Sequence, residues 1–186
     1  MKFSEINYQR PDLQALSLTF DELFQRLSSS SKMDEQREII DEIYKHRSHF
    51  ETMSQVASIH NSIDTTDVFY EQEQNYYDEN YPHYQECIKK FYRILLSLKN
   101  REDLEKIYGS QLFTIASLFL KTFSPEIIGD LQRENELVTV YTKLLASAAI
   151  EFEGQKRNLS EMLAFRTSLD RNTRKMATCL GKTHAQ

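Results

Sequence analysis

The amino-acid sequence predicts an all-α protein, organised as an antiparallel lobe of about six to eight helices with one small β-hairpin near residues 150–159. Apolar residues recur at the three- and four-residue spacing of a helix in nearly every segment. The 186 residues include only 4 glycines and 3 prolines, the two residue types that most often break helices. Near residue 150 apolar and charged residues instead alternate, which is typical of a strand.

The first helix is expected to start after Pro11 and Asp12, residue types that favour helix starts. Its apolar positions are Leu13, Leu16, Phe20, Leu23, Phe24 and Leu27. The run SSSSK interrupts this pattern, and a long second helix begins after Ser31, with Asp34 and Glu35 placed to interact favourably with the helix dipole. The apolar positions of this second helix are Ile39, Ile43, Tyr44, Phe50, Met53, Val56, Ala57 and Ile59.

Pro82 interrupts the next helical pattern. A third helix, capped by Ser62 or Thr66, is expected to stop before Pro82, because a proline disfavours the helical conformation of the residue that precedes it. A further helix is expected from Pro82 onward, followed by a short turn that ends at Gly109. The apolar positions are Val68, Phe69, Tyr76 and Tyr77 before the proline, and Tyr84, Cys87, Ile88, Phe91, Tyr92, Leu95 and Leu98 after it.

The segment that follows Gly109 is almost entirely apolar and is predicted to be a central core helix. Its apolar residues are Leu112, Phe113, Ile115, Ala116, Phe119 and Leu120. The next segment, FSPEII, combines Ser124 as an N-cap with Pro125 at the first helical position and Glu126 in the first turn, which makes it the strongest helix start in the chain. The helix that it begins contains Ile127, Leu131, Leu137, Tyr141, Leu144 and Leu145.

The stretch LASAAIEFEGQKRNLSE, residues 145–161, departs from the helical pattern. Residues 150–153 alternate apolar and acidic, and Gly154 allows a tight turn. A second short strand is expected through residues 157–159, after which Ser160 caps a helix. The sequence leaves open the alternative of an irregular loop between two helices.

Composition narrows the functional classes. A formal net charge of -5 and a pI near 5.6 argue against binding to nucleic acid or to an anionic membrane, because both require clustered lysine and arginine. The sequence contains no apolar run of membrane-spanning length, and the N-terminal MKFSEINYQRPD lacks the apolar core of a signal peptide, so a cytoplasmic location is expected. Cys87 and Cys179 lie far apart, and a small buried thiol is favoured over a disulfide for Cys87.

Four segments occur in the order of a known family: NYQRPD, TTDVFYEQEQNYYDENYP, FSPEIIGDLQRENELVTVYTKLLASAAIEFEGQKRNLSEM and SLDRNTRKMA. Together they resemble the N-terminal region of the oligoendopeptidase F group of thimet-oligopeptidase-like zinc metallopeptidases. The resemblance predicts an N-terminal helical lobe over residues 1–177 and a divergent tail over 178–186. It implies a mostly helical intracellular enzyme that hydrolyses short peptides, in which two lobes flank a deep channel and this lobe forms one wall.

The resemblance also implies a zinc ion, bound in the family by a His-Glu-x-x-His helix and a further glutamate. The histidines of this chain are His46, His49, His60, His83 and His184, and none of them fits that motif. We therefore assign no catalytic, cofactor-binding or metal-binding residue to this chain. Zinc and short-peptide substrates are expected of the intact family enzyme, and the isolated chain is predicted to be inactive.

Other candidate sites have simpler structural interpretations. Glu42, His46 and His49 share one helical face and could touch a divalent ion, but a solvated polar stripe is the preferred interpretation. The run YEQEQNYYDENYPHY could bind a cation or a peptide, although an amphipathic helix with packed tyrosines is favoured. GKTH is not a phosphate-binding loop, because Met176 occupies the position of that motif's first glycine. Asp170 is predicted to be a helix N-cap.

Two functional classes remain. The chain is either the non-catalytic N-terminal part of a zinc metallopeptidase or a free-standing, truncated helical module that mediates peptide or protein interaction. The sequence leaves open whether the chain is a cut domain or a truncated or frameshifted gene product. Removal of a catalytic half would expose apolar surface, so self-association of the isolated chain is expected.

Overall fold

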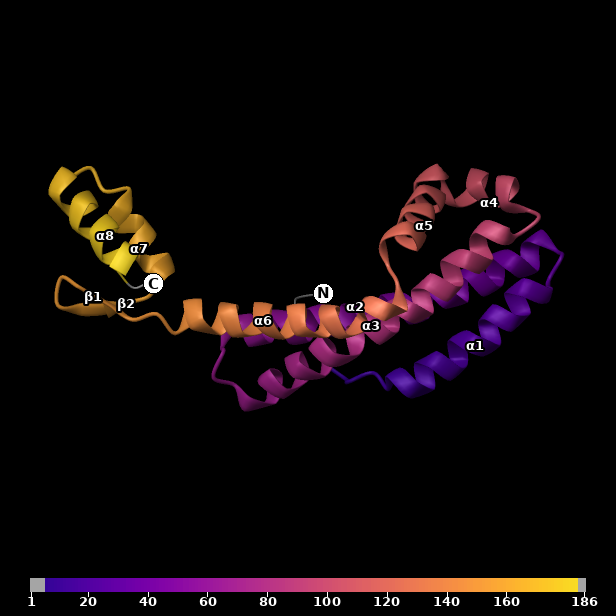
Figure 1. Ribbon diagram of the computed structural model, residues 1–186, viewed down its shortest axis with the longest axis horizontal. Coiled ribbons are helices and arrows are strands. Elements are labelled where there is room, and N and C mark those ends of the chain that lie inside the picture. The colour runs from indigo at the N-terminus through magenta and orange to yellow at the C-terminus, as the bar shows by residue number, and fades with distance from the viewer. Residues whose placement is uncertain (1–5, 184–186) are drawn as a thin grey trace. The chain divides into compact units, whose positions relative to one another are not determined.

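A computed structural model describes residues 6–183, apart from the side chains of residues 180–183 (Figure 1). Its helices are α1 (Leu13–Ser29), α2 (Met33–Ile63), α3 (Val68–Ser97), α4 (Arg101–Tyr108), α5 (Ser110–Thr122), α6 (Ile128–Ala146), α7 (Leu159–Arg166) and α8 (Arg171–Thr183), and its strands are β1 (Ile150–Phe152) and β2 (Gln155–Arg157). The predicted all-α fold with one small hairpin is confirmed.

The chain divides into two compact units, Met1–Glu136 and Leu137–Gln186. The boundary falls inside α6, so this helix contributes residues to both units. The divergence predicted for the tail over 178–186 stays a prediction, and its last three residues, including His184, lie outside the described residues.

The core of the first unit forms where α1, α2 and α5 pack against α3. Its largest fully buried side chains are Phe20, Phe50, Tyr84, Phe91 and Phe113. These positions lie on the apolar faces that helical spacing predicts. The start of α1 is also confirmed, because the Asp12 carboxylate accepts hydrogen bonds from the backbone N–H groups of Gln14 (2.9 Å) and Ala15 (3.0 Å).

Of three predicted helix caps, two are wrong and one is correct in position. α3 is capped by Asp67 rather than by Ser62 or Thr66, because Asp67 directly precedes the first helical residue and its carboxylate accepts from the backbone N–H groups of Phe69 and Tyr70. Ser124 is the N-cap residue of a short 3₁₀ helix, Pro125–Ile127, that leads into α6, with Pro125 and Glu126 in the first turn as predicted, although the Ser124 side chain makes no capping hydrogen bond. A third cap, predicted at Ser160, is also displaced, to Asn158.

The prediction that α5 is central in the core is also wrong. Only Phe113 and Ala116 of this helix are buried, whereas Ile115 and Leu118 are 46% and 54% exposed. α5 packs against α3 and α4, so neighbouring helices cover only part of its apolar circumference. The apolar composition of α5 therefore predicted a more complete burial of this helix than the structure shows.

Pro82 does not end a helix. α3 continues from Val68 to Ser97 with the proline inside it, so the expectation of two helices separated at this residue is wrong. Pro82 is buried. The tertiary contacts that permit this conformation belong to the candidate site and are described below.

The second unit contains the hairpin and the last two helices. β1 pairs antiparallel with β2, with Ile150 opposite Arg157 and Phe152 opposite Gln155. Glu153 and Gly154 both have positive φ (53° and 74°), as a tight two-residue hairpin turn requires. The second strand ends before Asn158 because the Asn158 side chain caps α7, in a reciprocal capping box with Glu161.

A small core holds this second unit together. Its buried residues are Ile150, Phe152, Met162 and Ala177. The Phe165 ring lies 4.9 Å from the Phe152 ring, and the Arg157 guanidinium lies 4.5 Å from the centre of the Phe165 ring. The alternating residues of β1 are thus divided between core and solvent as the sequence pattern predicts.

A buried carboxylate attaches the N-terminal segment of the first unit to α3. Glu73 is only 3% exposed, and its oxygens accept hydrogen bonds from Arg10 Nε (2.8 Å) and Nη2 (2.6 Å) and from the Tyr8 hydroxyl. The Tyr76 hydroxyl donates to the Pro11 carbonyl (2.7 Å). Residues 8–11 are thereby fixed against the first half of α3 before α1 begins.

Membrane-spanning length and the cysteines are two further features of the described residues. No single helix among the described residues is long and apolar enough to cross a membrane, although the bent pair Ser110–Thr122 and Pro125–Ala146 meets that criterion when taken together. Cys87 is a buried thiol outside any disulfide, as predicted, and Cys179 is exposed and also outside any disulfide.

We predict that Glu73→Gln destabilises the first unit by about 2 kcal/mol at pH 7, because Arg10 and Tyr8 lose a charged, buried acceptor. Urea unfolding followed by circular dichroism measures the change. The matched control is Gln72→Ala at the adjacent exposed position, which should change stability by less than about 0.5 kcal/mol. Equal effects of the two substitutions would contradict a stabilising role for Glu73.

The same pair predicts a pH dependence. Hydrogen bonds from Arg10 hold the pKa of the Glu73 carboxyl below its ordinary value of 4.5. Because the folded pKa is lower than the unfolded one, the stabilisation is fully present above pH 4.5 and is lost as pH falls through the lowered pKa. The stability difference between the wild type and Glu73→Gln should therefore shrink on acidification below pH 4.5. A difference that stays constant down to acid unfolding would argue against this assignment.

Candidate functional site

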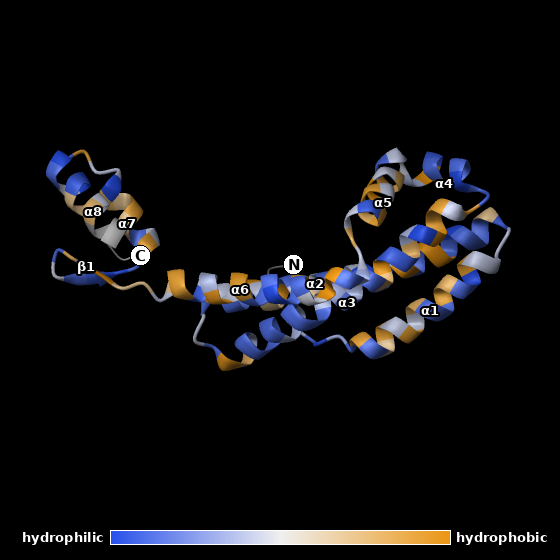
Figure 2. Ribbon diagram, in the orientation of Figure 1, coloured by the Kyte–Doolittle hydropathy of each residue, from blue (hydrophilic) through white to orange (hydrophobic). Residues whose placement is uncertain are grey.

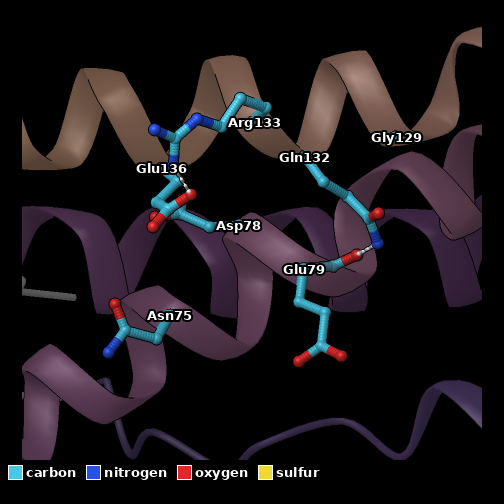
Figure 3. A pocket seen from close by; sticks show the side chains of 7 residues that line it. All are labelled: Asn75, Asp78, Glu79, Gly129, Gln132, Arg133 and Glu136. Carbon is cyan, nitrogen blue, oxygen red and sulfur yellow. Dashed lines mark hydrogen bonds and ion pairs between the residues drawn. The ribbon is translucent and has the colours of Figure 1, made fainter.

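A pocket of the first unit lies between α3 and the first half of α6 (Figure 3). It has a volume of about 590 Å³. Its lining residues are Asn75, Asp78, Glu79, Gly129, Gln132, Arg133 and Glu136. The pocket therefore depends on how α6 is attached to α3.

Pro82 determines where α6 attaches. A proline has no backbone N–H, so the carbonyl of Asp78, four residues earlier in α3, lacks the donor that residue 82 would otherwise supply. The Asn135 side chain of α6 donates to this carbonyl at 3.1 Å. Gln132, one turn earlier in α6, donates to the adjacent carbonyl of Glu79 at 2.8 Å (Figure 3). Two amide side chains of α6 thus bind the backbone of α3 beside the proline.

The pocket is acidic. Its lining includes the carboxylates of Asp78, Glu79 and Glu136, with Arg133 as the only lining cation among the described residues. Arg133 forms an ion pair with Glu136 on the same helix. The Asp78 carboxylate accepts a hydrogen bond from Gln74 at 2.7 Å, whereas the Glu79 side chain extends away from α6 (Figure 3). This lining can accept hydrogen bonds from donors in the pocket, but it includes no serine, cysteine or histidine that could act as a nucleophile with its base.

None of the sequence patterns predicted this pocket. The feature that could have indicated it is Pro82 itself, because a proline inside a continuous helix frees a carbonyl that needs a donor from elsewhere. The identity of the donors was not readable from the sequence. Gln132 and Asn135 are separated from Pro82 by 50 or more residues of chain.

The three residues considered as a metal site do not converge. Glu42 is exposed and pairs with Arg26 at 3.5 Å, and the His46 ring lies edge-on to the Phe20 ring at 6.4 Å. His49 is exposed. Across residues 6–183 we found no group of three or more histidine, cysteine, aspartate or glutamate side chains that could hold a metal ion.

The tyrosine-rich acidic run forms part of α3 and follows the amphipathic interpretation. Tyr77 and Tyr84 are buried, and burial raises the pKa of Tyr77 to about 12. Glu73 departs from that interpretation, because its carboxylate is buried and paired instead of facing water. The Asp170 prediction is supported, since the Asp170 carboxylate accepts from the Thr173 backbone N–H at 2.7 Å.

Comparison with known proteins relates this geometry to a family. Residues 3–123 match the family model described as the peptidase M3 N-terminal domain. Among curated proteins no significant match was found. The family match covers α1 to α5 completely and ends at the residue before Ser124.

Solved structures extend the similarity over the whole chain. PZ peptidase A, solved with an inhibitor, is 43% identical over 98% of this chain, with a TM-score of 0.94. A protein assigned as an oligoendopeptidase F is 39% identical over 100%, and another, from Bacillus anthracis str. Ames, is 38% identical over 99%, both with TM-scores of 0.94. The chain spans only about a third of the length of each, 33%, 33% and 34%.

We predict that Asn135→Ala destabilises the first unit by about 1 kcal/mol, because the Asp78 carbonyl loses its donor. In a Pro82→Ala background the new backbone N–H can supply that donor, so the cost of Asn135→Ala should fall to nearly zero. A double-mutant cycle in urea measures this coupling. Glu134→Ala, at the preceding exposed position of α6, is the control and should show no coupling. An equal cost of Asn135→Ala in both backgrounds would refute the proposed role of Asn135.

Proposed function

Because this chain belongs to the M3 peptidase family, as an N-terminal region of the oligoendopeptidase F type, we propose that it is the non-catalytic part of a zinc metallopeptidase and forms one wall of a channel for short peptides. The observation that carries this proposal is the agreement over almost the whole chain with structures three times as long. The activity, substrate and cofactor belong in this proposal to the intact enzyme.

The residues of this chain define what its role can be. Zinc hydrolysis requires converging ligands and a base that acts on the metal-bound water. The described residues do not fit that requirement, because they contain no metal-binding group and no His-Glu-x-x-His helix. We therefore attribute to this chain a positioning role, in which rigid helices limit the space open to a peptide. We place the intact enzyme in the cytoplasm.

Support for a rigid wall comes from the first unit. α3 is fixed to the N-terminal segment through Glu73 and to α6 through Asn135 and Gln132. Both attachments use hydrogen bonds to specific atoms, which fix register and orientation more tightly than apolar packing alone. Fixed channel walls favour substrate binding, because the protein itself then loses little conformational entropy. The main entropic cost is the freedom that the ligand loses on binding.

A specific observation favours a second candidate, a free-standing module that associates with itself. Six apolar side chains of α6 are between 38% and 65% exposed: Leu137, Val138, Val140, Tyr141, Leu144 and Leu145. Figure 2 shows that hydrophobic and hydrophilic residues both occur along α6. Apolar surface of this extent commonly marks a protein-protein contact. This candidate does not exclude the first, since an isolated wall of an enzyme can associate through the same surface.

The main proposal predicts that activity appears only when a catalytic part is present. The isolated chain should bind no stoichiometric zinc and should not cleave a short quenched-fluorescence peptide. A chimera in which this chain replaces the matching third of the Bacillus anthracis protein should bind zinc and cleave the peptide. Metal analysis and a chelator-controlled fluorescence assay measure both. Tightly bound zinc with chelator-sensitive turnover in the isolated chain would overturn the non-catalytic assignment.

The second candidate predicts self-association. Sedimentation velocity of the isolated chain should show a species heavier than the 22.0 kDa monomer as the protein concentration rises into the micromolar range. The apparent mass should fall on dilution, as it does for a reversible complex. A single monomeric species at every concentration would exclude the module that associates with itself and would leave the peptidase proposal untouched.

A further inference from the structure

The second half of α6 carries a continuous apolar surface. At about 100° per residue, six apolar side chains there cover an arc of roughly 160° around the helix. Lys143, the one charged residue in the sequence from 137 to 145, lies outside that arc. We call this surface the α6 stripe, and its members are Leu137, Val138, Val140, Tyr141, Leu144 and Leu145.

The α6 stripe belongs to a unit that leaves more large apolar side chains exposed than it buries. Beyond the stripe, Leu163, Leu169 and Met176 are 56%, 100% and 51% exposed. The described residues of this unit include neither a disulfide nor a group that could hold a metal ion, the two devices that usually compensate for a small core. The unit therefore requires apolar contacts from further polypeptide.

The solved relatives indicate which polypeptide supplies those contacts. Each of the three contains this fold at a TM-score of 0.94, yet the fold accounts for only 33% to 34% of the relative's chain. The matching family model describes an N-terminal domain, so further chain follows it in members of the family. Apolar surface on one part of a longer chain is normally buried against another part of that chain.

We propose that the α6 stripe is the surface against which the catalytic part of the intact peptidase packs, through apolar side chains of its own. This contact, which rests on the proposed function and goes beyond it, divides the chain into surfaces with different roles. The stripe stabilises the enzyme, and the channel for peptides is bounded by other residues.

The chemistry of the stripe favours a folded partner over a peptide. Five of its six side chains are aliphatic, and only Tyr141 has a polar atom. A peptide bound there would bury backbone N–H and C=O groups against a surface that offers them almost no hydrogen bonds. A folded part has already paired its backbone groups in secondary structure, so it can present apolar side chains alone.

Leu144→Ala tests the contact in two settings. In the isolated chain Leu144 is 65% exposed, so the substitution should shift the apparent melting temperature by less than about 1 °C. In the chimera with the Bacillus anthracis protein described above, the same side chain is buried by the catalytic part. Its truncation should there lower the melting temperature by about 3 °C or more.

A charged pair of variants supplies the matched control. Leu144→Glu should lower the melting temperature of the chimera further than Leu144→Ala, because a carboxylate is then forced into an apolar contact. Ala146→Glu introduces the same charge at an exposed position on the side of the helix opposite the stripe. This control should shift the melting temperature of the chimera by less than about 1 °C.

Hydrogen exchange gives a second readout that does not depend on thermal unfolding. Backbone amides of residues 137–146 should exchange at least about tenfold more slowly in the chimera than in the isolated chain, because the added contacts oppose local opening of the helix. Leu144→Glu should remove most of that protection, whereas Ala146→Glu should retain it.

Three results would overturn the inference while the zinc content and turnover of the chimera keep the proposed function intact. The first is an equal effect of Leu144→Ala in the isolated chain and in the chimera. The second is a raised KM for the peptide in that variant with an unchanged melting temperature, which assigns the stripe to the channel. The third is a chimera that dimerises and is dissociated by Leu144→Glu, which makes a second copy the occupant. A chimera without zinc or turnover overturns the proposed function, and this inference with it.

Discussion

The packing of the first unit depends on α3, because other elements contact this helix on nearly every side. α1, α2, α4 and α5 all contact this helix, and the N-terminal segment and α6 are hydrogen-bonded to it. Pro82 lies inside α3 and removes one of its backbone donors. The side chain of Asn135 compensates for that loss, so a defect in one helix becomes the attachment point of another.

Polar groups buried against this helix act as specific connections. The buried Glu73 carboxylate accepts hydrogen bonds from Arg10 and Tyr8. Near the other end of α3, the buried Gln36 side chain connects two loops. It donates a hydrogen bond to the Ser30 carbonyl and accepts one from the Asn100 side chain. Each such group would be costly to bury without its partner. The first unit therefore has few alternative packings, which suits a part whose proposed role is to bound a channel.

The two units differ in how their stability is achieved. Among the described residues, the first has a core of 21 buried residues, whereas the second has a core of four buried residues and a hairpin of two three-residue strands. A core that small buries little apolar area against the entropy of ordering about fifty residues. Burial of exposed apolar side chains of α6, such as Tyr141 and Leu144, would add apolar area to this small core.

The amino-acid sequence was sufficient to predict most of the helical segments, most of the buried faces, the hairpin turn at Gly154 and the family, because these depend on local spacing and on segments readable in order. Tertiary structure alone decided that α3 continues through Pro82, that α5 is half exposed, that Glu73 is buried and that a pocket forms between α3 and α6. Each of these depends on a partner many residues away, such as Asn135 for Asp78 or Arg10 for Glu73. The local sequence pattern can indicate which groups need a hydrogen-bonding or ionic partner. The identity of that partner is decided only in the folded chain, because long-range contacts are set by the packing of whole helices.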